Sequence, residues 1–212
     1  MPEPAGIARS AGEVCPGIHR YTMHDDRIDY QSDSYVIVGN ARVTLLDPLP
    51  MQDQELSRHG SIEAIVLTAS CHERSAWRYR TILKVPVYAP EGGVDFAEAP
   101  DRWYKAGDLL PGGLRAVHAP GPTDAHYAFY SPLHGGVVFC ADLLMNAGGE
   151  GLDFVPGEYQ DDPARTRDSV RKLLDLDLDL EILCTNHGDP VMRSAKQAIS
   201  KALERDKAKR HK

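Results

Sequence analysis

Reactive side chains follow three apolar stretches of the sequence that are predicted to be strands. These segments are Cys71-His72-Glu73-Arg74 after Ile62–Thr68, Asp142 after Gly136–Ala141, and Asn186-His187-Gly188-Asp189 after Glu181–Cys184. A thiol such as Cys71 can act as a soft metal ligand or as a nucleophile, and an inert thiol at a strand end is the alternative. No base stands at a spacing that would identify a Cys-His catalytic pair.

The elements that must position these residues are short strands in both halves of the chain, each half closed by helices. The other expected strands are Ser34–Gly39 and Arg42–Asp47, joined by a turn at Asn40, and Val85–Ala89, Leu114–His118 and Ala125–Ser131. Helices are expected over about Glu73–Lys84, from Asp162-Pro163 to about Leu174, and from about Met192 onwards. Asp175–Leu180 alternates strictly and fits an edge strand, a loop or a helix end. The pattern predicts an α/β fold with two mixed sheets and outer helices, a four-layer αββα sandwich, or failing that a three-layer α/β fold.

Length and charge narrow the class of protein. The 212 residues fit one domain, with halves at about 14–110 and 111–200 and a solvated basic tail at 201–212. The net charge of −7 argues against a nucleic-acid or anionic-membrane partner, so a small-molecule substrate or ligand is expected, and a homodimer is compatible with the sequence. The four cysteines have no CxxC spacing and no segment approaches the length of a membrane span, which predicts a cytoplasmic protein.

Four local sequences resemble those of metallo-β-lactamase-fold hydrolases, in the same order along residues 30 to 200. LTASCHERSA (67–76) stands where the family carries LTHxHxDH, and VHAPGPTDAHYAFY (117–130) is similar to HxPGHTxG. VVFCADLLM (137–145) resembles the strand that ends in the metal-bridging aspartate, and NHGDP (186–190) resembles the closing GHG motif. The resemblance implies the four-layer fold and a hydrolase. In the family, two zinc or other divalent ions share a hydroxide that attacks an ester, thioester, lactam or phosphoester.

Carried over by position, the resemblance implies a reduced metal site. The family's ligand positions fall on Ala69, Cys71, Glu73, Arg74 and Pro122, whereas Asp142 and His187 retain the bridging and closing residues. Ala69 and Pro122 offer no donor, and a guanidinium cannot be deprotonated to bind a metal. We therefore expect at most one Zn, Fe or Mn ion, or none. Its ligands would come from Cys71, Glu73, Asp142 and His187.

Two functions follow from this site. The first is a divergent hydrolase of a small ester, thioester or lactone, with Asp142, His187 and Arg74 as the expected catalytic residues. The second is a metal-free, non-catalytic relative whose cleft binds a ligand or partner. In this second hypothesis Arg74 fills the space of the lost metal and pairs with Asp142 or Glu73. His72 is expected to be a surface residue that points away from Cys71 if the chain there is extended.

Overall fold

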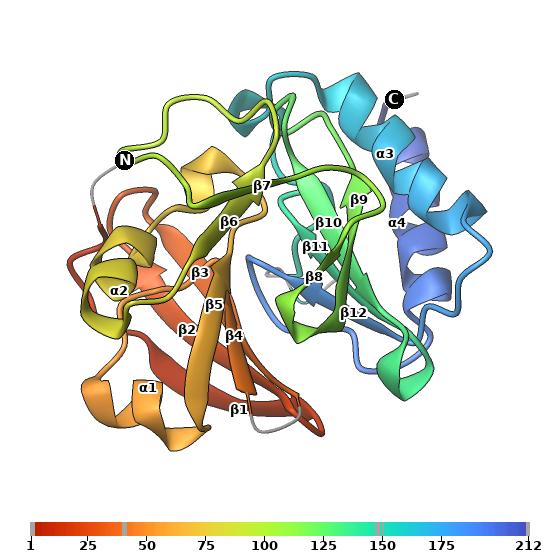
Figure 1. The fold of residues 1–212 in the computed structure, drawn as a ribbon. Coiled ribbons are helices and arrows are strands. Elements are labelled where there is room, and N and C mark those ends of the chain that lie inside the picture. The colour runs from red at the N-terminus through yellow and green to blue at the C-terminus, as the bar shows by residue number, and fades with distance from the viewer. Residues whose placement is uncertain (1–2, 40–41, 147–148, 150, 211–212) are drawn as a thin grey trace. The chain divides into compact units, whose positions relative to one another are not determined.

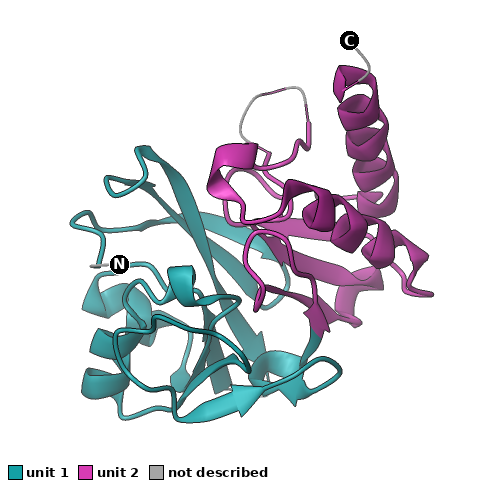
Figure 2. Cartoon of the chain, turned by 90° about the horizontal axis from the view of Figure 1, so that it is seen from above, with its two compact units in different colours: residues 1–116 teal, residues 117–212 magenta. Residues whose placement is uncertain are grey.

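The computed structural model describes residues 3–39, 42–146, 149 and 151–210. The chain forms two compact units, residues 1–116 and residues 117–212, which are coloured separately in Figure 2. Figure 1 shows the helices and strands of each unit. Within the described ranges, no helix is long and apolar enough to cross a membrane.

The first sheet is mixed, and its strand order follows the sequence from β1 to β7. Strands β1 to β4 pair antiparallel, and β4 to β7 pair parallel, with Leu46 opposite Val66 where β4 meets β5. The strands are β1 (Arg9–Cys15), β2 (Ile18–Asp25), β3 (Tyr30–Gly39), β4 (Arg42–Leu46), β5 (Ser61–Val66), β6 (Val87–Pro90) and β7 (Arg102–Tyr104). Parallel pairing places the carboxyl ends of β4, β5 and β6 at one edge of this sheet.

Two helices bury their apolar side chains against this sheet. Helix α1 (Asp53–Arg58) contributes Leu56 to the core, and α2 (Ala76–Leu83) contributes Trp77 and Tyr79. Helix α2 ends at Leu83, and the capping residue Lys84 that follows it has a left-handed conformation with φ 58°. The hydroxyl of Tyr79 donates to the carbonyl of Leu49 and accepts from the backbone N–H of Met51, so this helix is fixed by polar as well as apolar contacts.

The second sheet is also mixed, with strand order β12-β11-β10-β9-β8. Strand β10 pairs antiparallel with β11, and β11 pairs parallel with β12. The strands are β8 (Leu109–Leu110), β9 (Leu114–His118), β10 (Tyr127–Ser131), β11 (Val137–Ala141) and β12 (Ile182–Thr185). Short 3-10 turns are η1 (Ser70–His72), η2 (Pro111–Gly113), η3 (Leu133–Gly135) and η4 (Gly157–Tyr159).

Helices α3 (Pro163–Asp175) and α4 (Ala195–Arg210) complete the second unit. The Asp162 side chain caps α3 by accepting from the backbone N–H groups of Ala164 and Arg165, and Pro163 occupies the first turn, where its missing N–H leaves no bond unmade. The core of this unit packs Val170 and Leu173 of α3 and Ile199 of α4 with Val138 and Leu183 of the sheet.

The α/β class with two mixed sheets and helices is confirmed. The earliest strand expected from the sequence is Ser34–Gly39, and the structure adds β1 and β2 before it. Their apolar pattern is masked by polar residues at buried positions: Arg20 in β2 is 6% exposed because its guanidinium pairs with buried Asp33 at 2.9 Å. Asp175–Leu180 forms no strand, and the turn expected at Asn40 lies outside the described residues.

Candidate functional site

In the first unit, the predicted residues lie on the loop that follows β5, here called the β5 loop (residues 68–75). Asp47 directly follows β4 and its N–H donates to Val66 at 3.0 Å, so this carboxylate lies beside the start of the loop. Asp47 and Arg74 have positive φ angles of 47° and 36°, a conformation that is uncommon without glycine. Such backbone strain concentrates at functional segments and is kept only where surrounding contacts impose it.

A buried hydrogen-bond network joins Asp47, Thr68 and His72. The two oxygens of Asp47 accept from the Thr68 N–H at 2.8 Å and from the Thr68 hydroxyl at 2.7 Å. The same hydroxyl oxygen lies 2.6 Å from Nδ1 of His72. Burial raises the pKa of the Asp47 carboxyl, but His72, Arg74 and the Thr68 hydroxyl outweigh burial and hold that pKa below its usual value. The network therefore contains an ionised carboxylate at neutral pH.

Cys71 and His72 lie on the 3-10 turn η1, where His72 N–H donates to Ala69 at 3.2 Å. The expectation that His72 is a surface residue is wrong, since it is 5% exposed. The chain turns at this point instead of remaining extended, so successive side chains do not alternate between opposite faces. A metal-binding atom of His72 and the Cys71 sulfur lie within 4.8 Å of each other.

The Glu73 side chain binds two hydrogen-bond donors within the first unit. Its Oε2 accepts hydrogen bonds from Nε1 of Trp77 at 2.6 Å and from the backbone N–H of Ala97 at 2.8 Å. The residue is 1% exposed, and the Trp77 ring in turn meets Phe96 edge-on. This carboxylate therefore links the start of α2 to the loop between β6 and β7.

Arg74 is also buried, with 4% of its surface exposed. Its Nη1 donates to the backbone carbonyls of Asp33 at 2.7 Å and Asp47 at 3.0 Å. Against the effect of burial, Arg27 does most to lower the pKa of Asp25, and His72 that of Asp47; the Arg74 charge lowers both pKa values further. The guanidinium thus binds backbone in β3 and just after β4.

In the second unit, the two retained motif residues lie together. Asp142 follows β11 and His187 follows β12, and Oδ1 of Asp142 lies 3.2 Å from Nε2 of His187. Both side chains reach the surface in part, with 16% and 12% exposed. Parallel pairing of β11 with β12 places the two strand ends at one edge of the sheet. Ala141, before Asp142, has a positive φ of 47°, so the chain turns sharply where the carboxylate is presented.

His126 supports this strand end from inside the unit. Its Nδ1 donates to the carbonyl of Ala119 at 2.9 Å, and its Nε2 accepts the backbone N–H of Asp142 at 3.2 Å. His126 is fully buried, and both ring nitrogens are used. His118 contacts the carbonyl of Asp124 at 2.9 Å. Both histidines therefore make hydrogen bonds to the backbone of the second unit.

The predicted site residues are divided between the units: Cys71, Glu73 and Arg74 belong to the first, and Asp142 and His187 to the second. The prediction missed the buried network of Asp47, Thr68 and His72. A signal was present, because Asp47 ends one predicted strand and Thr68 ends the next. Two polar residues at neighbouring strand ends are a known arrangement for sites on α/β sheets.

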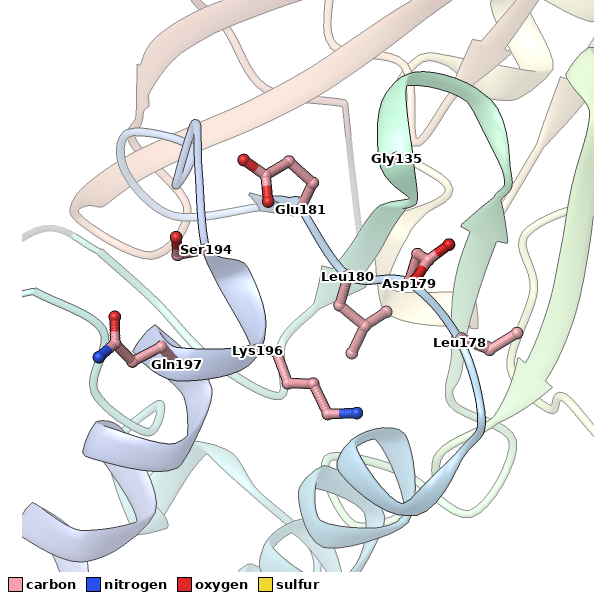
Figure 3. Close-up of a pocket in the computed structure, with 8 residues that line it drawn as sticks. All are labelled: Gly135, Leu178, Asp179, Leu180, Glu181, Ser194, Lys196 and Gln197. Atoms are coloured by element: carbon pink, nitrogen blue, oxygen red, sulfur yellow. The ribbon is translucent and has the colours of Figure 1, made fainter.

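A separate pocket of about 510 Å³ lies in the second unit, before β12 and at the start of α4 (Figure 3). Its polar lining comprises Asp179, Glu181, Ser194, Lys196 and Gln197. Asp179 and Glu181 directly precede β12, whereas His187 follows its other end, so the pocket and the Asp142–His187 pair lie at opposite ends of this strand.

A family model described as the metallo-beta-lactamase superfamily matches residues 14–205. No curated protein matches the chain.

Solved structures show the same fold. The metallo-beta-lactamase FIM-1 from Pseudomonas aeruginosa, in a mono-zinc form, is 16% identical with a TM-score of 0.72, over 95% of this chain and 96% of that one. DIM-1 metallo-beta-lactamase exposed to ceftazidime is 14% identical with a TM-score of 0.71, over 95% and 98%. TTHA1623 in a di-iron-bound form is 24% identical with a TM-score of 0.58, over 76% and 89%. At these identities the likeness establishes the fold alone.

Proposed function

Because the chain belongs to the metallo-beta-lactamase superfamily, we propose that it is a divergent hydrolase of a small ester, thioester or lactone with at most one metal ion. The observation that carries this proposal is the contact of 3.2 Å between Asp142 and His187. These two residues stand at the motif positions that this sequence retains. A carboxylate and an imidazole held side by side at strand ends, each partly open to solvent, have no evident packing role.

The donor chemistry fits one divalent ion better than two. We propose that the ligands are some of Cys71, Glu73, Asp142 and His187, the residues at the family's ligand positions. Ala69 is fully buried and has no donor side chain, and the Pro122 side chain has none either. A thiolate, carboxylates and an imidazole are a set that Zn accepts readily, with Fe and Mn as alternatives. When bound, such an ion lowers the pKa of a coordinated water towards neutrality and polarises the scissile carbonyl.

The chain's own groups would prepare this chemistry. His126 holds the backbone of Asp142 through its Nε2, and the Asp142–His187 contact orients both side chains. We assign Arg74 a positioning role, because its guanidinium bonds to two backbone carbonyls and is 4% exposed. Its fixed charge is thereby held within the strands of its own unit, where it supports the β5 loop.

The second candidate function is a metal-free relative that binds a ligand or partner. The engagement of Glu73 with Trp77 and Ala97 favours it, because this carboxylate already has a structural task. For either function we propose a small-molecule ligand and no nucleic-acid or membrane partner, and a homodimer stays compatible with the chain. The cytoplasm is the proposed location, in keeping with Cys15, Cys71, Cys140 and Cys184, which form no disulfide with one another in the described part of the chain.

Metal content tests the proposal directly. The untagged protein should hold about one equivalent of metal after dialysis against zinc, iron or manganese, measured by inductively coupled plasma mass spectrometry. Asp142→Asn and His187→Gln should each lose it, whereas His118→Gln, at an exposed structural histidine, should keep it. Esterase, thioesterase and lactonase assays then identify the reaction. Metal content near zero in all dialyses, together with no activity, would leave the metal-free relative as the better account.

A further inference from the structure

The hydrogen bonds around His72 define which ring nitrogen carries the proton. The Thr68 hydroxyl has one hydrogen, and it donates this hydrogen to Asp47, 2.7 Å away. The contact of 2.6 Å between the same hydroxyl and Nδ1 of His72 must then be donated by Nδ1–H. In the neutral imidazole the lone pair is consequently on Nε2.

This arrangement is the one that orients histidines as metal ligands. A ligating histidine usually donates its second N–H to a carboxylate or other acceptor, which fixes the tautomer and the ring. Here the acceptor is a hydroxyl that is itself polarised by a carboxylate. Thr68 and Asp47 are 1% and 0% exposed, so the network is shielded from competing water.

The neighbouring thiol supplies a second donor. The Cys71 sulfur and a His72 ligand atom lie within 4.8 Å, and tetrahedral zinc places a sulfur and a nitrogen ligand roughly 3.5 Å apart. Glu73 is a poorer candidate, since its Oε2 already accepts from Trp77 and Ala97. If Glu73 turned away to bind a metal, the indole N–H of Trp77 and the backbone N–H of Ala97 would lose their acceptor.

We propose that His72, through Nε2, is a nitrogen ligand of the metal ion, together with Cys71. Thr68 and Asp47 are its positioning residues, and Glu73 is not a ligand. The inference rests on the proposed function, because it assigns ligands to that same ion. A thiolate and an imidazole favour zinc over manganese or magnesium.

Zinc affinity of the full chain tests this assignment. After removal of metal with a chelator, Zn²⁺ is titrated in competition with a chromophoric chelator, and Co²⁺ is used as a spectroscopic probe of thiolate binding. His72→Gln should weaken zinc binding by at least about 100-fold, and Cys71→Ser should remove the sulfur-to-cobalt charge-transfer band. Glu73→Gln, which tests the exclusion of Glu73, should stay within about threefold of the wild type, and His118→Gln, at an exposed histidine, is the control.

The positioning role has its own readout. Thr68→Val should weaken zinc binding by about 10- to 100-fold, and Thr68→Ser, which keeps the hydroxyl, should restore it. Nitrogen-15 spectra of the imidazoles should show the Nδ1–H form of His72 in the wild type and in Thr68→Ser, but a mixture of tautomers in Thr68→Val. The same spectra test the assignment if His72→Gln does not fold. Zinc binding to the wild type should then shift the ring signals of His72.

The outcomes separate the two levels of the proposal. A wild-type chain that binds no zinc or cobalt overturns the proposed metal function and this assignment with it. A wild-type chain that binds one ion, while His72→Gln binds it as tightly or Glu73→Gln loses it, overturns the assignment alone. Unchanged His72 ring signals on zinc binding would have the same meaning.

Discussion

The two places where the family's metal motifs fall have changed in different ways. In the β5 loop, Glu73 and Arg74 are almost fully buried and bind the indole and backbone groups of their own unit. At the ends of β11 and β12, Asp142 and His187 remain partly exposed and contact each other. The first region uses its motif positions to hold strands and loops together, whereas the second still presents polar side chains to solvent. Stability and metal binding should therefore respond differently to mutations in the two regions.

The largest effect on stability is expected from Arg74→Ala. It leaves two buried carbonyls without their donor and removes a cation close to Asp25 and Asp47. Loss of one partner from a buried charge network typically costs about 3–5 kcal/mol in the free energy of unfolding. Urea unfolding should report it. The control is Arg42→Ala, because the Arg42 side chain is 67% exposed and lies 3.8 Å from Glu63. Equal stability of the two variants would contradict a positioning role for Arg74.

The second largest effect on stability is expected from Glu73→Ala. It should lower the free energy of unfolding by about 2–4 kcal/mol, because the Trp77 indole N–H and the Ala97 N–H stay buried without their acceptor. Hydrogen exchange should accelerate in the loop between β6 and β7. Glu73→Gln keeps an oxygen acceptor and should recover part of the loss. The control is Glu98→Ala in the same loop, where the side chain is 46% exposed. If exchange in this loop is the same in Glu73→Ala and Glu98→Ala, the structural role of Glu73 is refuted.

The site residues at the ends of β11 and β12 could be predicted from the sequence better than the contacts of those in the β5 loop. Asp142 and His187 could be located because they keep the family's residue types after apolar strands. The contacts of Glu73 with Ala97 and of Arg74 with Asp33 could not be predicted, because these partners are distant in the sequence and are brought close by tertiary packing that leaves no periodic pattern. His72 was misjudged for a local reason: a 3-10 turn and a strand end are equally compatible with Ser70-Cys71-His72, and only the turn buries the imidazole.

A smaller effect is expected where α3 meets α4. Arg167 donates two hydrogen bonds, of 2.7 and 2.8 Å, to Asp206, and this contact holds the pKa of the Asp206 carboxyl below its usual value. The stability that the pair contributes is then present above the unfolded pKa of about 3.9 and is lost as pH falls through the folded value. Asp206→Asn should lower the melting temperature at pH 7 by roughly 2–6 °C, and by progressively less as the pH falls below about 4. Asp168→Asn, from an exposed pair with Arg171, should show little change over the same pH range.

The smallest effect on stability is expected at the Asp142–His187 pair, although its effect on metal content should be the clearest. In metal-free protein, Asp142→Asn and His187→Gln should change the free energy of unfolding by about 1 kcal/mol, the net worth of one hydrogen-bonded contact, because both replacements keep polar atoms at these partly buried positions. With zinc present, only the wild type should gain stability, since an ion that binds the folded state raises the melting temperature by mass action. Thermal unfolding without zinc measures the stability of the metal-free variants, and thermal unfolding with zinc measures the stabilisation that the ion adds. A loss in the metal-free variants as large as that of Arg74→Ala would mean that this pair, too, has become part of the structural framework, and the contrast between the two regions would disappear.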